Sequence, residues 1–106
     1  MELRVARHTN DLESIKSFYT AILDFELLGN FENHDNYNGI FLGYPNADWH
    51  LEFTASHDKA NHDFDEDDVL VLYPESRNKY DSLIEKLSKN NILSVPSKNP
   101  YWNKNG

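Results

Sequence analysis

Hydrophobic and polar positions alternate along the stretch DWHLEFTAS, residues 48–56. Apolar side chains occupy every second position there: Trp49, Leu51 and Phe53. Because successive side chains of a β-strand point to opposite faces, the alternation predicts a strand with one core face and one polar face. His50 and Glu52 share the polar face. If that face borders a cavity rather than bulk water, they are candidate ligands or an acid–base pair.

The rest of the first half of the chain shows similar patterns. LRVARH at residues 3–8 predicts a short strand that places Arg4 and His8 on one face. Asn10 and Glu13 predict a capping box, followed by an amphipathic helix over residues 11–23. Further strands are predicted in DFELLGNF and NGIFLGY, separated by the turn-forming ENHDNYNG. With the strand at 48–54, residues 1–54 form a β-α-β-β-β unit.

The second half begins in the same way. After a polar, acidic linker at residues 55–67, DDVLVLYP predicts a strand, ESRNKYDSLIEKLSKNN an amphipathic helix and ILSV another strand. The apolar helix positions superpose on those of the first half at a constant offset of 65, which indicates a duplicated unit. A complete copy would extend about a dozen residues past Gly106. We therefore expect an α+β fold of two tandem β-α-β-β-β units, the second (68–106) incomplete at its C-terminus.

Composition and charge narrow the classes of function. The 106 residues suffice for a single domain, and 39% of them are apolar, enough for a core. A net charge of −8 argues against nucleic acid or an anionic membrane as a partner. The chain has no apolar run long enough to span a membrane, no signal-peptide pattern and no cysteine. By elimination, we expect a soluble cytoplasmic protein.

The tandem pattern, together with HTNDLESIKSFYTAILDFELLG and HLEFT, resembles the vicinal oxygen chelate superfamily of glyoxalases, bleomycin-resistance proteins and extradiol dioxygenases. The resemblance covers essentially the whole chain. It implies that the two units form a cup-shaped mixed sheet around a cavity, where enzymatic members hold a divalent metal. NPYWNKNG resembles the lead-in to two closing strands in a subgroup of these proteins, and those strands do not follow here.

The resemblance also implies positions for metal ligands, on the first and fourth strands of each unit. Glu52 takes the fourth-strand position of the first unit, and Asp68 takes the first-strand position of the second. The first-strand position of the first unit, usually histidine in glyoxalase-like members, falls on Arg4, which cannot ligate a cation. The fourth position would lie on the absent strand. The expected cofactor is therefore none, or a divalent metal bound weakly by Glu52 and Asp68.

Each candidate residue carries an alternative interpretation. Glu52 either forms an ion pair with Arg4, ligates a metal or is solvated. Arg4 is also suited to anchor an anionic substrate, since its planar fork matches carboxylates and phosphates. His8 and His50 are candidates for acid, base or ligand roles, against simple hydrogen bonding. The candidate ligand-binding set is Arg4, His8, His50 and Glu52.

Two hypotheses of function follow. The first is a protein of the bleomycin-resistance type, which binds a small cationic or aromatic compound between its units without chemistry. The alternative is a metal-dependent lyase or dioxygenase of the same superfamily, or a truncated member without activity. An open sheet edge invites pairing with another chain, so we also expect a homodimer.

Overall fold

A computed structural model describes residues 1–105 of the chain. The chain divides into two compact units, Met1–Asn61 and His62–Gly106, and each is described here by itself. Within residues 1–105, every helix is too short or too polar to cross a bilayer.

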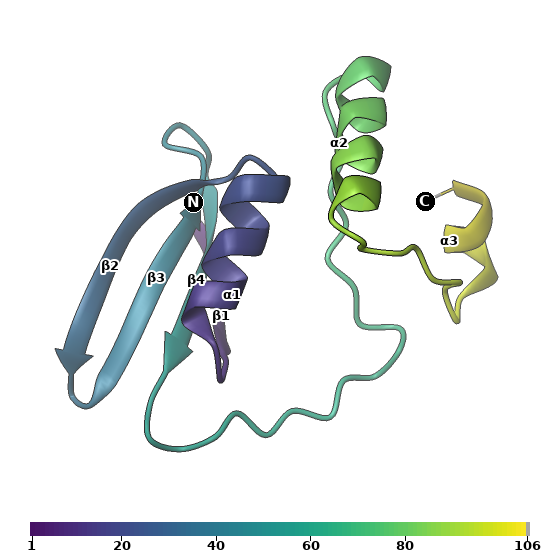
Figure 1. Ribbon diagram of the computed structural model, residues 1–106. Helices are drawn as coiled ribbons and strands as arrows, with labels where there is room; N and C mark the ends of the chain where they lie inside the picture. Colours follow the sequence, from purple (N-terminus) through teal and green to yellow (C-terminus); the bar gives the residue numbers. More distant parts are fainter. Residues whose placement is uncertain (106) are drawn as a thin grey trace. The chain divides into compact units, whose positions relative to one another are not determined.

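The first unit is a four-stranded mixed sheet with a helical segment against one face (Figure 1). In chain order, its elements are β1 (Leu3–His8), α1 (Leu12–Ser17), the π-helical η1 (Phe18–Ile22), β2 (Glu26–His34), β3 (Tyr37–Gly43) and β4 (Trp49–Ala55). The strand order is β1-β4-β3-β2, in which β1 runs parallel to β4 and the other neighbours are antiparallel. The order of elements predicted for this half of the chain is confirmed.

The helix is capped by a different residue from the predicted one. The N-cap is Asp11, whose carboxylate accepts a hydrogen bond of 3.0 Å from the backbone N–H of Ser14. The amide oxygen of Asn10 instead accepts a hydrogen bond of 2.8 Å from the backbone N–H of Ala60. Asp and Asn are equally good N-caps; here Asp11 caps the helix, and Asn10 contacts the loop after β4.

The core lies between the helical segment and one face of the sheet. Its buried cluster consists of Phe25, Ile40, Leu42, Leu51 and Phe53. Leu42 is fully buried, and Trp49 packs against the cluster from its margin. The predicted core face of residues 48–54 is therefore confirmed. Because strand side chains alternate, the opposite face of β1 and β4 carries the polar candidates.

The two edge strands of the sheet differ in regularity. β2 shifts its register against β3 twice, and Asp35 and Asn36 close the hairpin with φ angles of 52° and 70°. Positive φ at both turn residues matches the twist of antiparallel strands. In contrast, β1 pairs with β4 in unbroken register from Leu3 to His8. Irregular edges resist pairing with other chains, so β1 is the more exposed template of the two.

The second unit contains α2 (Arg77–Lys89) and α3 (Pro100–Asn105). The helix predicted in ESRNKYDSLIEKLSKNN is confirmed, capped by Ser76. It begins 65 residues after α1, the same offset that relates the apolar positions. The C-terminal stretch NPYWNKNG contributes a short helix that the pattern did not predict.

The two strands predicted in the second unit are not formed. Residues 69–74 and 92–95 have no regular secondary structure. Within residues 62–104 no side chain is buried, and the apolar run from Val69 to Tyr73 is exposed. A strand exists only when a neighbouring strand takes up its backbone hydrogen bonds, and the described part of this unit supplies none. The predicted α+β class is nevertheless confirmed, with an open four-stranded sheet that fits an incomplete cup.

Candidate functional site

Parallel pairing of β1 with β4 brings three of the four predicted site residues together. Arg4 lies opposite His50 in the register, and Glu52 is the next residue on the same face of β4. The Nε–H of Arg4 donates to Nε2 of His50 over 2.9 Å, and its Nη1 lies 3.4 Å from Oε1 of Glu52. The ion pair between Arg4 and Glu52 that the sequence raised as an alternative is therefore present.

His50 connects this pair to the start of the chain. Its Nδ1 lies 3.3 Å from a carboxylate oxygen of Glu2. Arginine has only donors, so Nε2 of His50 accepts from Arg4 and the ring proton resides on Nδ1, where it donates to Glu2. The result is a continuous polar chain from Glu2 through His50 and Arg4 to Glu52, with the histidine in a defined tautomer.

Aromatic and apolar side chains border the arginine. The guanidinium carbon of Arg4 lies 5.1 Å from the centre of the Phe41 ring, within the range of a cation–π contact. The Phe41 ring also meets His50 edge-on at 5.8 Å between centroids. An open hollow of about 250 Å³ lies here, lined by Glu2, Arg4, Leu28, Phe41 and His50.

Three of these lining residues, Glu2, Leu28 and Phe41, were not candidates from the sequence. Phe41 lies on the face opposite the core, because Ile40 and Leu42 take the core positions of β3. The period of two along NGIFLGY was the available signal for this placement. Glu2 precedes the first strand and Leu28 belongs to β2, so only the three-dimensional arrangement brings them to the hollow.

His8, the fourth predicted residue, has separate surroundings. It lies four residues beyond Arg4, about 13 Å along an extended strand. Its Nε2 lies 2.9 Å from the carbonyl oxygen of Asp58, and its Nδ1 lies 3.0 Å from the hydroxyl of Thr54. Because the carbonyl only accepts, Nε2 donates to it and the Thr54 hydroxyl donates to Nδ1. These contacts fasten the loop after β4 to the end of β1.

The donor set around Glu52 does not fit a metal ion. Arg4 already occupies Nε2 of His50 and faces the Glu52 carboxylate, so a cation there would meet a permanent positive charge. Within the described residues, no three His, Cys, Asp or Glu side chains lie close enough together to hold a metal. Asp68 lies in the second unit, where its side chain is exposed and its backbone N–H donates to the carbonyl of Asp65 over 2.9 Å. A metal role for Glu52 and Asp68 stays a prediction.

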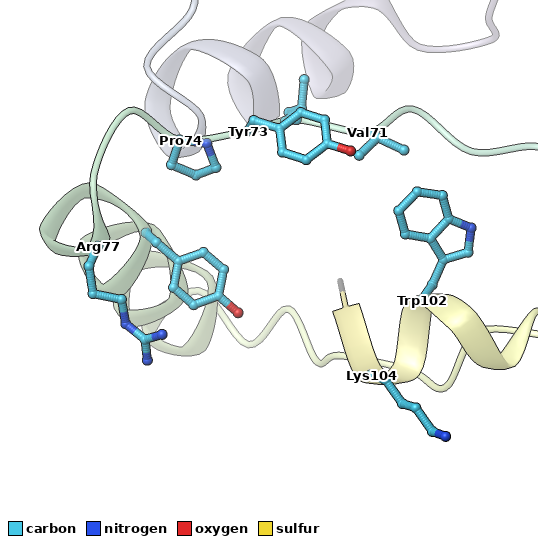
Figure 2. A pocket seen from close by; sticks show the side chains of 8 residues that line it. Val71, Tyr73, Pro74, Arg77, Trp102 and Lys104 are labelled. Atoms are coloured by element: carbon cyan, nitrogen blue, oxygen red, sulfur yellow. The ribbon is translucent and has the colours of Figure 1, made fainter.

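A second hollow, of about 330 Å³, lies within the second unit. Its lining is mainly apolar and aromatic: Val71, Leu72, Tyr73, Pro74, Arg77, Tyr80, Trp102 and Lys104. Figure 2 shows Val71, Tyr73 and Trp102 around the open space, whereas the ends of Arg77 and Lys104 point away from it. Arg77 is also engaged by Asp81 at 3.1 Å. The hollow offers apolar contact without converging polar groups, so the Arg4 face is the better candidate site.

Two family models match the chain in succession. The model of the YycE-like N-terminal domain matches residues 3–54, and that of the YycE-like C-terminal domain matches residues 67–106. The uncharacterised YycE protein of Bacillus subtilis (strain 168) is 34% identical over 106 residues, which cover 99% of this chain and 76% of that protein.

Solved structures agree with these matches. The crystal structure of Bacillus subtilis YycE, a protein of unknown function for which a glyoxalase or fosfomycin-resistance role has been suggested, superposes with a TM-score of 0.85 at 34% identity, over 97% of this chain and 76% of that one. The trypanothione-dependent glyoxalase I of Leishmania major superposes with a TM-score of 0.68 at 22% identity, over 86% of this chain and 66% of that one. At that identity the second likeness concerns the fold alone. Together they confirm a vicinal oxygen chelate-like fold.

Proposed function

The chain belongs to the YycE-like family, and from this premise we propose that it binds a small molecule on the sheet face that carries Arg4. In this proposal, Arg4 holds an oxygen-bearing, anionic end of the ligand, and His50 and Glu52 hold Arg4 in place. The protein would act by binding, without a metal in the first unit. The glyoxalase or fosfomycin-resistance role suggested for the Bacillus subtilis relative is compatible with a small oxygen-rich ligand.

The proposal rests on one observation: the Arg4 side chain is held by its neighbours and yet is exposed to solvent. The side chain is 54% exposed, although its neighbours Glu52 and His50 are only 15% and 13% exposed. Its contacts within the described residues use Nε–H and one N–H of Nη1. Three of the five guanidinium N–H groups therefore remain for an incoming acceptor. A guanidinium that is fixed by its neighbours and still accessible is suited to bind an oxyanion at low entropic cost.

The alternative is a metal-dependent lyase or dioxygenase. In that reading the bound metal would supply Lewis-acid stabilisation of an enolate or bind vicinal oxygens. The observed position of Arg4 argues against a metal in the first unit, because Arg4 already contacts His50 Nε2 and Glu52 Oε1, the atoms that would ligate the metal. The binding proposal therefore has the stronger support.

The test is a titration with small anions followed by NMR of the backbone amides. We expect acetate, benzoate and fosfomycin, used as probes, to shift the resonances of β1 and β4 near Arg4. The variant Arg4→Gln should lose this response, and Lys59→Gln, which removes the same charge from an exposed loop position, should keep it. Equal binding by Arg4→Gln and the wild type would overturn the proposal.

A metal assay separates the two functions. Protein purified without chelator should carry no stoichiometric divalent metal, and Glu52→Gln should not change that content. Stoichiometric metal in the wild type that disappears in Glu52→Gln would instead establish the metal-dependent alternative.

A further inference from the structure

The face of Phe41 offers the first clue to the kind of ligand. Its ring lies beside the guanidinium of Arg4 and is partly exposed. The neighbours of Phe41 on the same face of β3 are Gly39 and Gly43, which have no side chains. The ring of Phe31 covers Gly39, so the glycines border Phe41 without covering it. A ligand held by Arg4 therefore has an aromatic surface beside its point of attachment.

The charges around the hollow give the second clue. Arg4 is its one cation, and two carboxylates belong to the same polar chain, Glu52 at 3.4 Å from Arg4 and Glu2 on the far side of His50. With His50 in the tautomer that both partners require, the group carries a net charge of −1. A monoanion is attracted by Arg4 in the same way as Glu52 is. The second negative charge of a dianion is repelled by the carboxylates of Glu2 and Glu52.

The size of the hollow gives the third clue. Its volume of about 250 Å³ lies below the range of roughly 300–1,000 Å³ that is typical for drug-sized ligands. Leu28 supplies an apolar wall next to Phe41. The space suits a small molecule with a flat apolar body and one anionic end.

From these three observations we propose that the site selects flat monocarboxylates over compact dianions such as phosphate. Phe41 sets the preference for a flat body, and Glu2 disfavours the second negative charge. The proposal rests on the proposed function, because it assumes that Arg4 holds the anionic end. It gives Phe41 and Glu2, neither of which was a candidate from the sequence, a role in specificity.

The experiment compares three probes by NMR titration at about pH 8, where phosphate is mainly dianionic. Benzoate should bind about threefold to tenfold more tightly than acetate, as expected for one aromatic contact. In Phe41→Leu this ratio should approach one, and in Phe31→Leu, which changes the neighbouring ring, it should persist. Phosphate should bind more weakly than benzoate and gain about twofold to threefold in Glu2→Gln, because Glu2 is exposed and its charge is screened.

Several outcomes would overturn this inference. Phosphate that binds more tightly than benzoate would do so, as would an unchanged benzoate-to-acetate ratio in Phe41→Leu. If Phe41→Leu fails to fold, magnetisation transfer from benzoate to the Phe41 ring protons in the wild type replaces that variant, and its absence counts against the proposal. Binding that depends on Arg4 but shows no preference refutes only this inference, whereas binding unaffected by Arg4→Gln refutes the proposed function beneath it.

Discussion

The contact between Arg4 and Glu52 allows a quantitative test by a double-mutant cycle. The four proteins are the wild type, Arg4→Gln, Glu52→Gln and the double variant. At 3.4 Å, two unit charges attract by about 1–5 kcal/mol for an effective dielectric constant between 80 and 20. Solvent around the half-exposed guanidinium and the length of the contact reduce the net coupling to about 0.5–1 kcal/mol.

The single variants should differ in a predictable way. Arg4→Gln loses both the ion pair and the hydrogen bond to His50, so we expect its free energy of unfolding to fall by about 1–2 kcal/mol. In a unit of this size, 1 kcal/mol corresponds to roughly 4–8 °C in Tm. Glu52→Gln keeps the hydrogen bond between Arg4 and His50 and should lose less.

Urea unfolding of the four proteins, at low salt and at about 1 M NaCl, measures the coupling directly. High salt should reduce it, since one partner is accessible to counterions. A coupling energy of zero within error would refute the reasoning that Glu52 holds Arg4 in place. A coupling energy that stays the same at high salt would show that solvent does not screen the ion pair in the way that the expected coupling of about 0.5–1 kcal/mol assumes.

Three further predictions concern the fold. Burial raises the pKa of the Tyr19 phenol above its usual value of 10.0, against a smaller lowering by Arg7, so the folded state favours the protonated phenol. The protonated Tyr19 phenol should therefore contribute fully to stability below about pH 10, and this contribution should disappear as the pH rises through the folded-state pKa. In thermal unfolding followed by circular dichroism, Tyr19→Phe should show a smaller loss of stability at alkaline pH than the wild type. Asp24 has a φ of 59°, so Asp24→Gly should raise the free energy of unfolding by about 0.5 kcal/mol in urea, and a loss of stability would show that its side-chain contacts outweigh the backbone strain. We propose pairing of two copies at the open sheet edge, so light scattering should give twice the chain mass of 12.4 kDa, and a monomer at all concentrations would contradict it.

The first unit was predictable because the two central strands, β3 and β4, each bury apolar residues on one face. In residues 48–54 a shift of the register by one position would bury His50 and Glu52 and expose Leu51 and Phe53, so the pattern alone determines both faces. The same logic applies to β1, where Val5 packs against the core and Arg4 faces away. Residue type did not identify the N-cap of α1, because Asn10 and Asp11 are adjacent and equally suitable for that position.

The second unit was less predictable because a strand forms only when it is hydrogen-bonded to a neighbouring strand. Val69 to Tyr73 have the apolar and β-branched side chains that favour a buried strand, but no strand forms there. The backbone hydrogen bonds of a strand, however, depend on a neighbour that this pattern does not specify. The helix α2 needs no such neighbour for its backbone, and it forms where the sequence predicted it.

The candidate site combines these two situations. Arg4, His50 and Glu52 meet because the faces of β1 and β4 follow from burial and the resemblance places the two strands side by side. Glu2 and Leu28 join them only through the register of the complete sheet, which local patterns do not encode, whereas the alternation along NGIFLGY already places Phe41 on the face opposite the core. Position 4 then determines the chemistry: a side chain with a permanent positive charge neutralises Glu52 within the protein and occupies the free nitrogen of His50. A face arranged in this way has its cation built into the chain, which favours recognition of an anion over capture of a metal.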